Sequence, residues 1–101
     1  MKLTMREIRN RYHELRPDGH WFDKDTMRFF NTELPARGYL DIDGDIWFVT
    51  GETGPDGKKR FTLRRMQPNG SIGTFGEFQQ YRERSDALAA LHDHLAQGET
   101  A

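Results

Sequence analysis

Between residues 38 and 81 apolar side chains recur at every second position, and this period determines the fold class. Successive side chains of a β-strand point to opposite faces, so a two-residue period predicts strands. Turn-forming residues divide the stretch at Asp43-Gly44, at 51–59 and at Pro68-Asn69-Gly70. The sequence therefore predicts a four-stranded antiparallel meander, with strands over residues 39–42, 45–50, 60–67 and 72–80.

The pair Asp43-Gly44 is typical of a two-residue hairpin turn, which would set the register of the first two strands. In that register one face of the sheet carries Leu40, Ile42, Trp47 and Val49. The other face carries Tyr39, Ile46 and Phe48. Because both faces are apolar, we expect the strand over 45–50 to be central and covered on both sides.

The amino-terminal segment has the signals of a helix. Thr4 and Glu7 form a capping box, and Ile8 and Tyr12 belong to an apolar stripe that ends before Pro17-Asp18-Gly19. The remaining face is charged and includes Arg9 and Arg16. Two interpretations of this face are open. It is a basic strip that binds phosphates or an acidic partner, or it is a solvated surface on which Arg and Glu form helical pairs.

Residues 20–31 combine four aromatic side chains and a methionine with a helix-start signal. Asp23 is the expected cap of a short second helix beginning at Lys24. Its apolar stripe would consist of Met27, Phe30 and Leu34.

Near the other end of the chain, Ser85 is the expected cap of an alanine-rich helix that ends at Gly98. Its leucines at 88, 91 and 95 fall on one side. The elements together predict one α+β domain over residues 1–98, with an N-terminal helix, a short second helix, the four-stranded sheet, a C-terminal helix and a frayed tail at 99–101. The expected core comprises Ile8, Tyr12, Phe22, Met27, Phe30, Leu40, Trp47, Phe61, Leu63, Phe78 and Leu91.

Composition restricts the possible functions. The chain has 101 residues, which is enough for one modest core, and its lack of cysteine excludes disulfides and thiolate metal sites. No apolar run approaches the length of about 18 residues that a membrane span needs, so we expect a cytoplasmic protein without a membrane partner. Fifteen basic residues oppose 16 acidic ones, so any attraction to a charged partner must come from local patches.

Candidate catalytic and metal motifs fail on geometry. Residues 51–58 have the wrong glycine spacing for a phosphate-binding loop and precede a strand instead of a helix. Residues 41–45 lack the spacing and closing glutamate of a calcium loop, which favours an acidic hairpin tip. His92 and His94 point about 200° apart on a helix and are expected to be exposed. We therefore expect no enzyme activity, no metal and no cofactor.

The segment 58–65 has five positive charges in eight residues. Basic side chains interleaved with aromatics on a sheet are typical of sheet-based DNA readers, whereas a solvated charge cluster can protect a sheet edge. Arg64 and Arg65 are adjacent, so they face opposite ways if the strand is regular. The expected partner-binding residues are Lys58, Lys59, Arg60, Arg64 and Arg65, assisted by Arg9 and Arg16.

Two motifs carry a resemblance. Residues 21–30 fit the pattern W/Y-F-x-x-D-T-M-R-F-F, and residues 76–81 read G-E-F-Q-Q-Y. Within residues 20–90 the chain resembles small proteins of unknown function encoded by bacteriophages, plasmids and integrative elements. The resemblance implies a genomic setting in bacterial mobile DNA and implies no reaction.

These observations predict a small non-catalytic accessory protein of a mobile element that binds a host or defence protein, as inhibitors of CRISPR effectors do. The alternative is a sheet-based nucleic-acid-binding protein. Positive charges gathered on one concave face would favour nucleic acid as the partner. Mixed acidic and basic patches around an aromatic would favour a protein.

Overall fold

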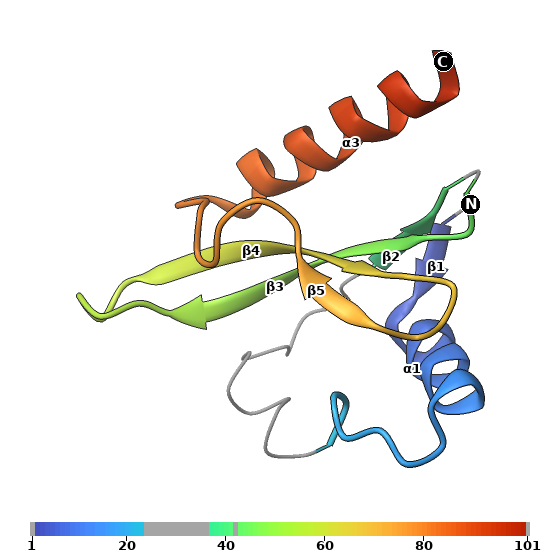
Figure 1. Ribbon diagram of the computed structural model, residues 1–101. Coiled ribbons are helices and arrows are strands. Elements are labelled where there is room, and N and C mark those ends of the chain that lie inside the picture. The colour runs from blue at the N-terminus through green and yellow to red at the C-terminus, as the bar shows by residue number, and fades with distance from the viewer. Residues whose placement is uncertain (1, 24–36, 42, 101) are drawn as a thin grey trace.

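The computed structural model describes residues 2–23, 37–41 and 43–100, and within them the fold is α+β. One antiparallel sheet has five strands in the order β1-β2-β3-β4-β5, with a helix near each end of the chain (Figure 1). The elements in chain order are β1 (Lys2–Thr4), α1 (Met5–Leu15), β2 (Arg37–Leu40), β3 (Ile46–Thr53), β4 (Lys59–Met66), β5 (Ile72–Thr74) and α3 (Arg84–Thr100).

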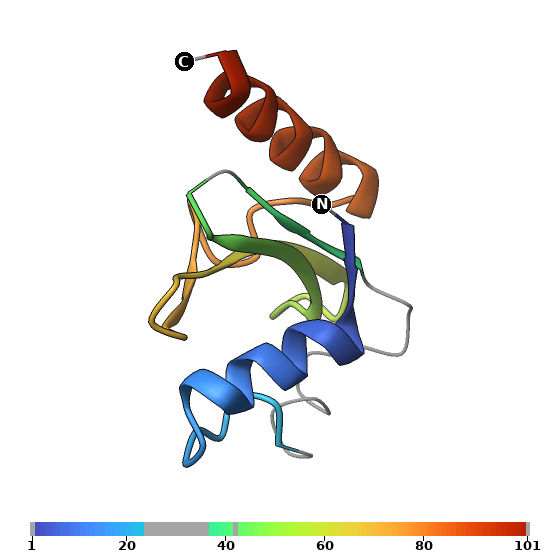
Figure 2. The same ribbon diagram turned by 90° about the vertical axis from the view of Figure 1, so that its right-hand side faces the viewer.

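The sheet lies between α1 and α3 and therefore has an apolar cluster on each face (Figure 2). Alternate residues of β3 supply both clusters, as the two-residue period predicted. The α1-side cluster consists of Leu3, Ile8, Tyr12, Phe22, Ile46, Phe48 and Met66. The α3-side cluster consists of Trp47, Val49, Leu63, Ala87 and Leu91.

The prediction of four strands is wrong, because β1 adds a fifth strand at the edge of the sheet next to β2. Leu3 pairs with Gly38 and is buried, whereas its two neighbours in β1 are exposed. A three-residue strand with one apolar side chain is too short to display a period. A Cβ atom at position 38 would collide with the side chain of Ile8, so glycine allows α1 to pack closely on β2.

The start of α1 is as the sequence predicted. The side-chain oxygen of Thr4 accepts a hydrogen bond from the Glu7 amide at 3.2 Å, and the Thr4 amide donates to Glu7 Oε1 at 3.1 Å. Both halves of the capping box are therefore formed, and they satisfy two amide groups at the helix end. The helix ends at Leu15, just before the predicted stop.

The register predicted for β2 and β3 is wrong by one residue. The Asp41 amide donates to the Asp45 carbonyl at 2.9 Å, so the connection spans three residues instead of two. Gly44 has a φ of +88°, which fits the left-handed last residue of a three-residue hairpin loop. Because a slip of one residue exchanges the faces, Leu40 packs on the α1 side and Tyr39 on the α3 side, opposite to the prediction.

The last strand is shorter than predicted, because β5 ends at Thr74 and residues 75–81 form a loop. This loop returns to β4, where Phe61 and Tyr81 exchange two backbone hydrogen bonds of 2.7 and 3.0 Å. The assignment of Phe78 to the core is wrong, since half of this residue is exposed.

Most of the other expected core residues are confirmed. The buried ones are Ile8, Tyr12, Phe22, Trp47, Leu63 and Leu91, and the half-buried ones are Leu40 and Phe61. Met27 and Phe30, with the rest of the expected second helix, lie outside the described residues. The C-terminal helix packs its leucines on the Trp47 cluster as expected, but it continues through Thr100, beyond the predicted end at Gly98. Among the described residues, no helix is long and apolar enough to cross a membrane.

Candidate functional site

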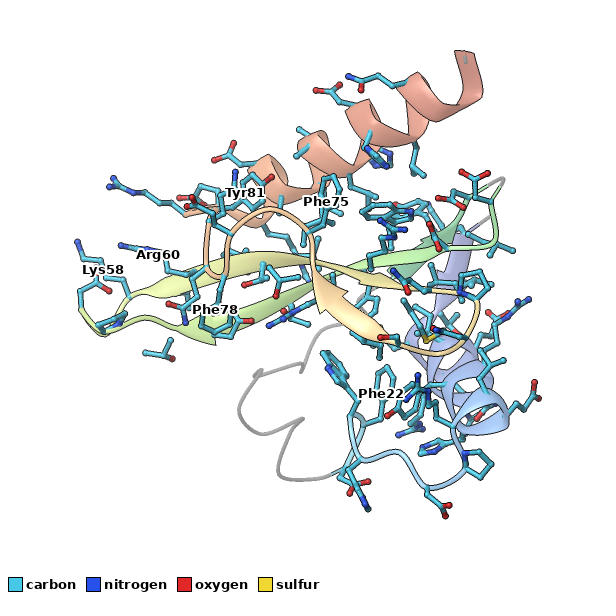
Figure 3. All side chains as sticks on the ribbon, in the orientation of Figure 1. Phe22, Lys58, Arg60, Phe75, Phe78 and Tyr81 are labelled. Atoms are coloured by element: carbon cyan, nitrogen blue, oxygen red, sulfur yellow. The ribbon has the colours of Figure 1, made fainter. Side chains whose placement is uncertain are left out.

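Three of the predicted binding residues lie together at the tip of the hairpin that joins β3 to β4. Lys58 and Arg60 lie at this tip (Figure 3). Lys58 and Lys59 are exposed, and Arg60 is half-buried. A guanidinium nitrogen of Arg60 lies 2.8 Å from Asp56 Oδ2. The charge of Arg60 is therefore largely compensated, whereas those of the two lysines face solvent.

A groove of about 550 Å³ opens beside this tip. One wall is the tip of the β3–β4 hairpin, and the other is the segment between Tyr81 and α3. The two backbone hydrogen bonds between Phe61 and Tyr81 bring the chain at Tyr81 alongside β4. The pairing does not continue beyond this bridge, and the segment that leads to α3 diverges from β4. We call this feature the tip groove; it is lined by Asp56, Lys58, Lys59, Arg60, Phe61, Arg82 and Glu83.

The tip groove has mixed charge with a positive excess. Its lining has four cationic side chains and two carboxylates, an excess of two positive charges in a chain with a net charge of −1. Within the described part of the chain, the side chains of Lys58, Lys59 and Arg82 make no hydrogen bond or ion pair. A hydrogen bond from the Lys58 amide, followed by the charge of Arg60, lowers the pKa of Asp56. Asp56 is therefore ionised at neutral pH and belongs to the charge pattern.

Arg64 is not part of this surface, and its assignment to an exposed basic patch is wrong. Its side chain is only 9% exposed and points to the α1 side of the sheet. Its guanidinium donates to Glu52 Oε1 at 3.0 Å and to Thr50 Oγ1 at 3.1 Å. A third bond, of 2.7 Å, goes to Thr74 Oγ1. Burial lowers the pKa of Arg64, and the hydrogen bond and charge of Glu52 oppose that shift.

The buried pair connects the sheet to the 75–81 loop. Thr62 Oγ1 donates to Glu52 Oε2 at 3.0 Å and accepts from the amide of Gln79 at 2.8 Å. Gln79 has a φ of +58°, an uncommon conformation that this hydrogen bond helps to hold. The ring of Phe78 lies 5.5 Å from the Arg64 guanidinium. The network therefore fixes the loop that leads into the second wall of the tip groove.

Arg65 points to the opposite face from Arg64, as the strand period predicted. Its Nε lies 3.1 Å from Asp45 Oδ2, an ion pair without the geometry of a hydrogen bond, and its guanidinium lies over the ring of Trp47. Burial raises the pKa of Asp45, and the charge of Arg65 opposes that shift. This pair supports the β2–β3 hairpin and lies away from the tip groove.

The two arginines predicted on the N-terminal helix are also separate from the tip groove. Arg9 and Arg16 are exposed, but α1 lies at the end of the molecule opposite the β3–β4 tip (Figure 1). Arg16 Nε donates to the carbonyl of Asn69 at 3.1 Å and so connects α1 to the turn after β4. The seven predicted residues therefore do not form one surface.

The acidic hairpin is a structural turn. The carboxylate of Asp41 accepts bonds of 2.9 Å from the amides of Asp43 and Asp45, and one of 2.8 Å from Trp47 Nε1. Among the described residues, no group of three or more histidines and carboxylates could hold a metal ion. His94 is half-buried against the rings of Trp47 and Phe75, so the expectation that both histidines of α3 are exposed holds only for His92.

The second wall of the groove was not among the predicted binding residues. Arg82 and Glu83 follow the last predicted strand, and no local pattern shows that they return to face Lys58. The available signal was the aromatic pair of Phe61 and Tyr81, because aromatic residues favour cross-strand pairing. That signal does not indicate which residues pair.

A known family matches most of the sheet and the whole lining of the tip groove. The model of a family of unknown function, DUF7447, matches residues 4–92, which include every residue that lines the groove. No curated protein and no solved structure matches the chain. Since the matched residues make up most of the 101-residue chain, the protein belongs to the DUF7447 family.

Proposed function

We propose that the protein is a small, non-catalytic binding protein that takes a partner protein through the tip groove. The resemblance of its two sequence motifs to proteins of bacteriophages, plasmids and integrative elements supports a mobile-element setting. A host or defence protein is then the partner, as for inhibitors of CRISPR effectors.

The mixed charge of the tip groove carries this proposal. The groove is lined by Lys58, Lys59 and Arg82, by the carboxylates of Asp56 and Glu83, and by the half-buried Phe61. Charged groups of both signs around an aromatic are typical of the rim and centre of a protein interface. Such a pattern selects a partner with complementary charges and disfavours other proteins through like-charge contacts.

Sheet-based nucleic-acid binding is the alternative, and the excess of positive charge at the groove favours it. Two observations weigh against it. The central strand β3 has buried side chains on both faces, so a sheet reader would lack an open face there. Asp56 and Glu83 also lie among the cations, where they would repel a phosphate backbone.

The two proposals predict different results in a capture experiment with lysate of the bacterium that carries the gene. Tagged wild-type protein and two charge-reversal variants are incubated with lysate, and half of each sample is treated with nuclease. Lys58→Glu with Lys59→Glu changes the groove, and Arg9→Glu with Arg16→Glu is the control with the same charge on α1. Captured proteins are identified and then purified for calorimetric titration against the same three proteins.

We expect one protein to be enriched by the wild type and by the α1 control and lost from the groove variant, with or without nuclease. The purified partner should bind with the same dependence on the two lysines. Capture that disappears after nuclease treatment would support the nucleic-acid alternative. Binding that survives reversal of both lysines would remove the tip groove from the proposal.

A further inference from the structure

We infer that the tip groove binds an extended acidic segment of the partner, a stretch of peptide with carboxylates at alternate positions. This inference rests on the proposed protein-binding function and names the chemistry of the bound segment. It follows from three features of the groove, which are its backbone edge, its arrangement of charges and its size.

The backbone edge of β4 continues into the groove. The amide and the carbonyl of Phe61 both face the outer edge of β4, where they form hydrogen bonds with Tyr81. In an antiparallel strand the backbone groups of successive residues face opposite edges. The amide of Lys59, two residues earlier, therefore faces the same edge. Lys59 lines the groove where the Tyr81 segment has moved away from β4. An extended peptide can place a carbonyl oxygen against this amide, as in recognition by strand addition.

The charges suit carboxylates at intervals better than a continuous chain of phosphates. Lys58 and Lys59 stand on one wall and Arg82 on the other, with Asp56 and Glu83 among them. Alternate side chains of an extended peptide lie on the same side, so two carboxylates two residues apart can reach cations while the intervening residue avoids Asp56. A nucleic-acid strand has a charge on every nucleotide and cannot leave such gaps.

The groove also has the size and the apolar surface for a short peptide. Its volume of about 550 Å³ lies within the range of ligand sites, and the groove opens to solvent. The partly exposed ring of Phe61 gives one apolar contact. Most of the specificity therefore comes from charge and from the Lys59 amide.

Fluorescence anisotropy with defined probes tests the inference. The first probe is a labelled twelve-residue peptide in which glutamate alternates with serine, and the second has glutamine in place of each glutamate. The third is a labelled twelve-nucleotide strand of thymidine. The full-length proteins are the wild type, Lys59→Glu with Arg82→Glu, and the control Arg9→Glu with Arg16→Glu; circular dichroism and urea melts verify that each is folded.

We expect the wild type and the α1 control to bind the glutamate peptide equally and the groove variant to bind at least about tenfold more weakly, because two attractive contacts become repulsive. The glutamine peptide should bind more weakly than the glutamate peptide. Equal weakening by both variants would mean that overall charge drives the binding and would overturn the inference. Tighter binding of the thymidine strand would overturn it in favour of phosphate.

The result is distinguishable from failure of the proposed function. If a purified partner binds through Lys58 and Lys59 but the glutamate peptide does not bind, the acidic-segment inference is wrong and the binding function stands. If the peptide binds and no partner is captured, the groove chemistry stands and the cellular role falls. Chemical shift changes confined to the amides of Lys59 and its neighbours would locate the peptide at the β4 edge.

Discussion

Arg64 is the residue whose role differs most between sequence and structure. In the sequence it is one of five clustered cations, and in the fold it is a buried donor to Glu52, Thr50 and Thr74. Removing one partner of a buried ion pair leaves the other charge without compensation, which costs more than the pair itself contributes. The arginine is therefore needed for the fold, and reversing its charge would not report on binding.

The first prediction concerns this pair. Replacing Arg64 by methionine should reduce the free energy of unfolding by about 3–5 kcal/mol, because the carboxylate of Glu52 remains buried and unpaired. The double variant Arg64→Met with Glu52→Leu should be more stable than the single variant, since neither charge is then buried. Urea unfolding followed by tryptophan fluorescence measures both. A single variant within 1 kcal/mol of wild type would show that the pair is not buried in solution.

The second prediction is a pH dependence at the start of α1. Hydrogen bonds from the Thr4 amide and then the Thr4 hydroxyl lower the pKa of Glu7 below its ordinary value of 4.5. A carboxylate whose folded pKa is lowered stabilises the protein above its unfolded pKa, and this stability is lost as the pH falls through the folded pKa. Urea melts of wild type and Glu7→Gln should therefore differ at pH 7 and converge as the pH falls below 4.5. A difference that stayed constant with pH would contradict the capping role.

The β2–β3 hairpin shows what decides register at the scale of an element. Its strands were predictable from their apolar period, and the place of its turn was predictable from Asp43 and Gly44. The number of loop residues was not predictable, because an Asp-Gly pair fits both a two-residue turn and the end of a three-residue loop. Asp41 favours the longer loop, since its carboxylate accepts hydrogen bonds from the amides of Asp43 in the loop and Asp45 just after it.

The third prediction tests that selection. Replacing Asp41 by alanine should cost about 1–3 kcal/mol, because two amides and the buried indole of Trp47 lose their acceptor. Asp41→Asn is the matched variant, since its remaining oxygen still accepts from the amides. It should cost less and still change the fluorescence of Trp47. Equal stability of the alanine variant and wild type would mean that the turn residues set the register without this carboxylate.

At the scale of the whole molecule, the sheet separates two apolar clusters. Ile8 belongs to the cluster under α1 and Leu91 to the cluster under α3, and neither cluster shares a residue with the other. Substitutions without shared partners add within about 0.5 kcal/mol, whereas residues in contact couple by about 0.5–3 kcal/mol. Substitutions on opposite faces of the sheet should therefore have additive effects on the free energy of unfolding.

The fourth prediction is a comparison of two double-mutant cycles by urea unfolding. Ile8→Val with Leu91→Ala, one on each face, should show a coupling below about 0.5 kcal/mol. Phe22→Leu with Phe48→Leu should show a larger coupling, because these two rings lie 6.3 Å apart on the same face. Strong coupling across the sheet would mean that the two clusters form one core.

The sequence predicted the α+β class, both long helices and most of the core, because apolar periods and the capping box of α1 are local signals, although α3 begins at Arg84, before its predicted cap Ser85. It predicted three of the seven residues that line the candidate site, since Lys58, Lys59 and Arg60 are adjacent in the chain. Arg82 joins them through the return of the 75–81 loop, which depends on Gln79 bonding Thr62 and on the pairing of Phe61 with Tyr81. Those contacts between distant residues leave no period in the sequence.

The small edge strand β1 has a consequence for the order of folding. The strands β3 and β4 pair over eight residues across one short loop, so the entropy cost of closing this loop is small. Leu3 of β1 instead pairs with Gly38, 35 residues later, so this contact closes a much longer stretch of chain at a higher cost in entropy. We therefore expect the β3–β4 hairpin to form early and β1 to join it late. A slow step in closing this contact would therefore delay the amino-terminal edge and leave the tip groove formed.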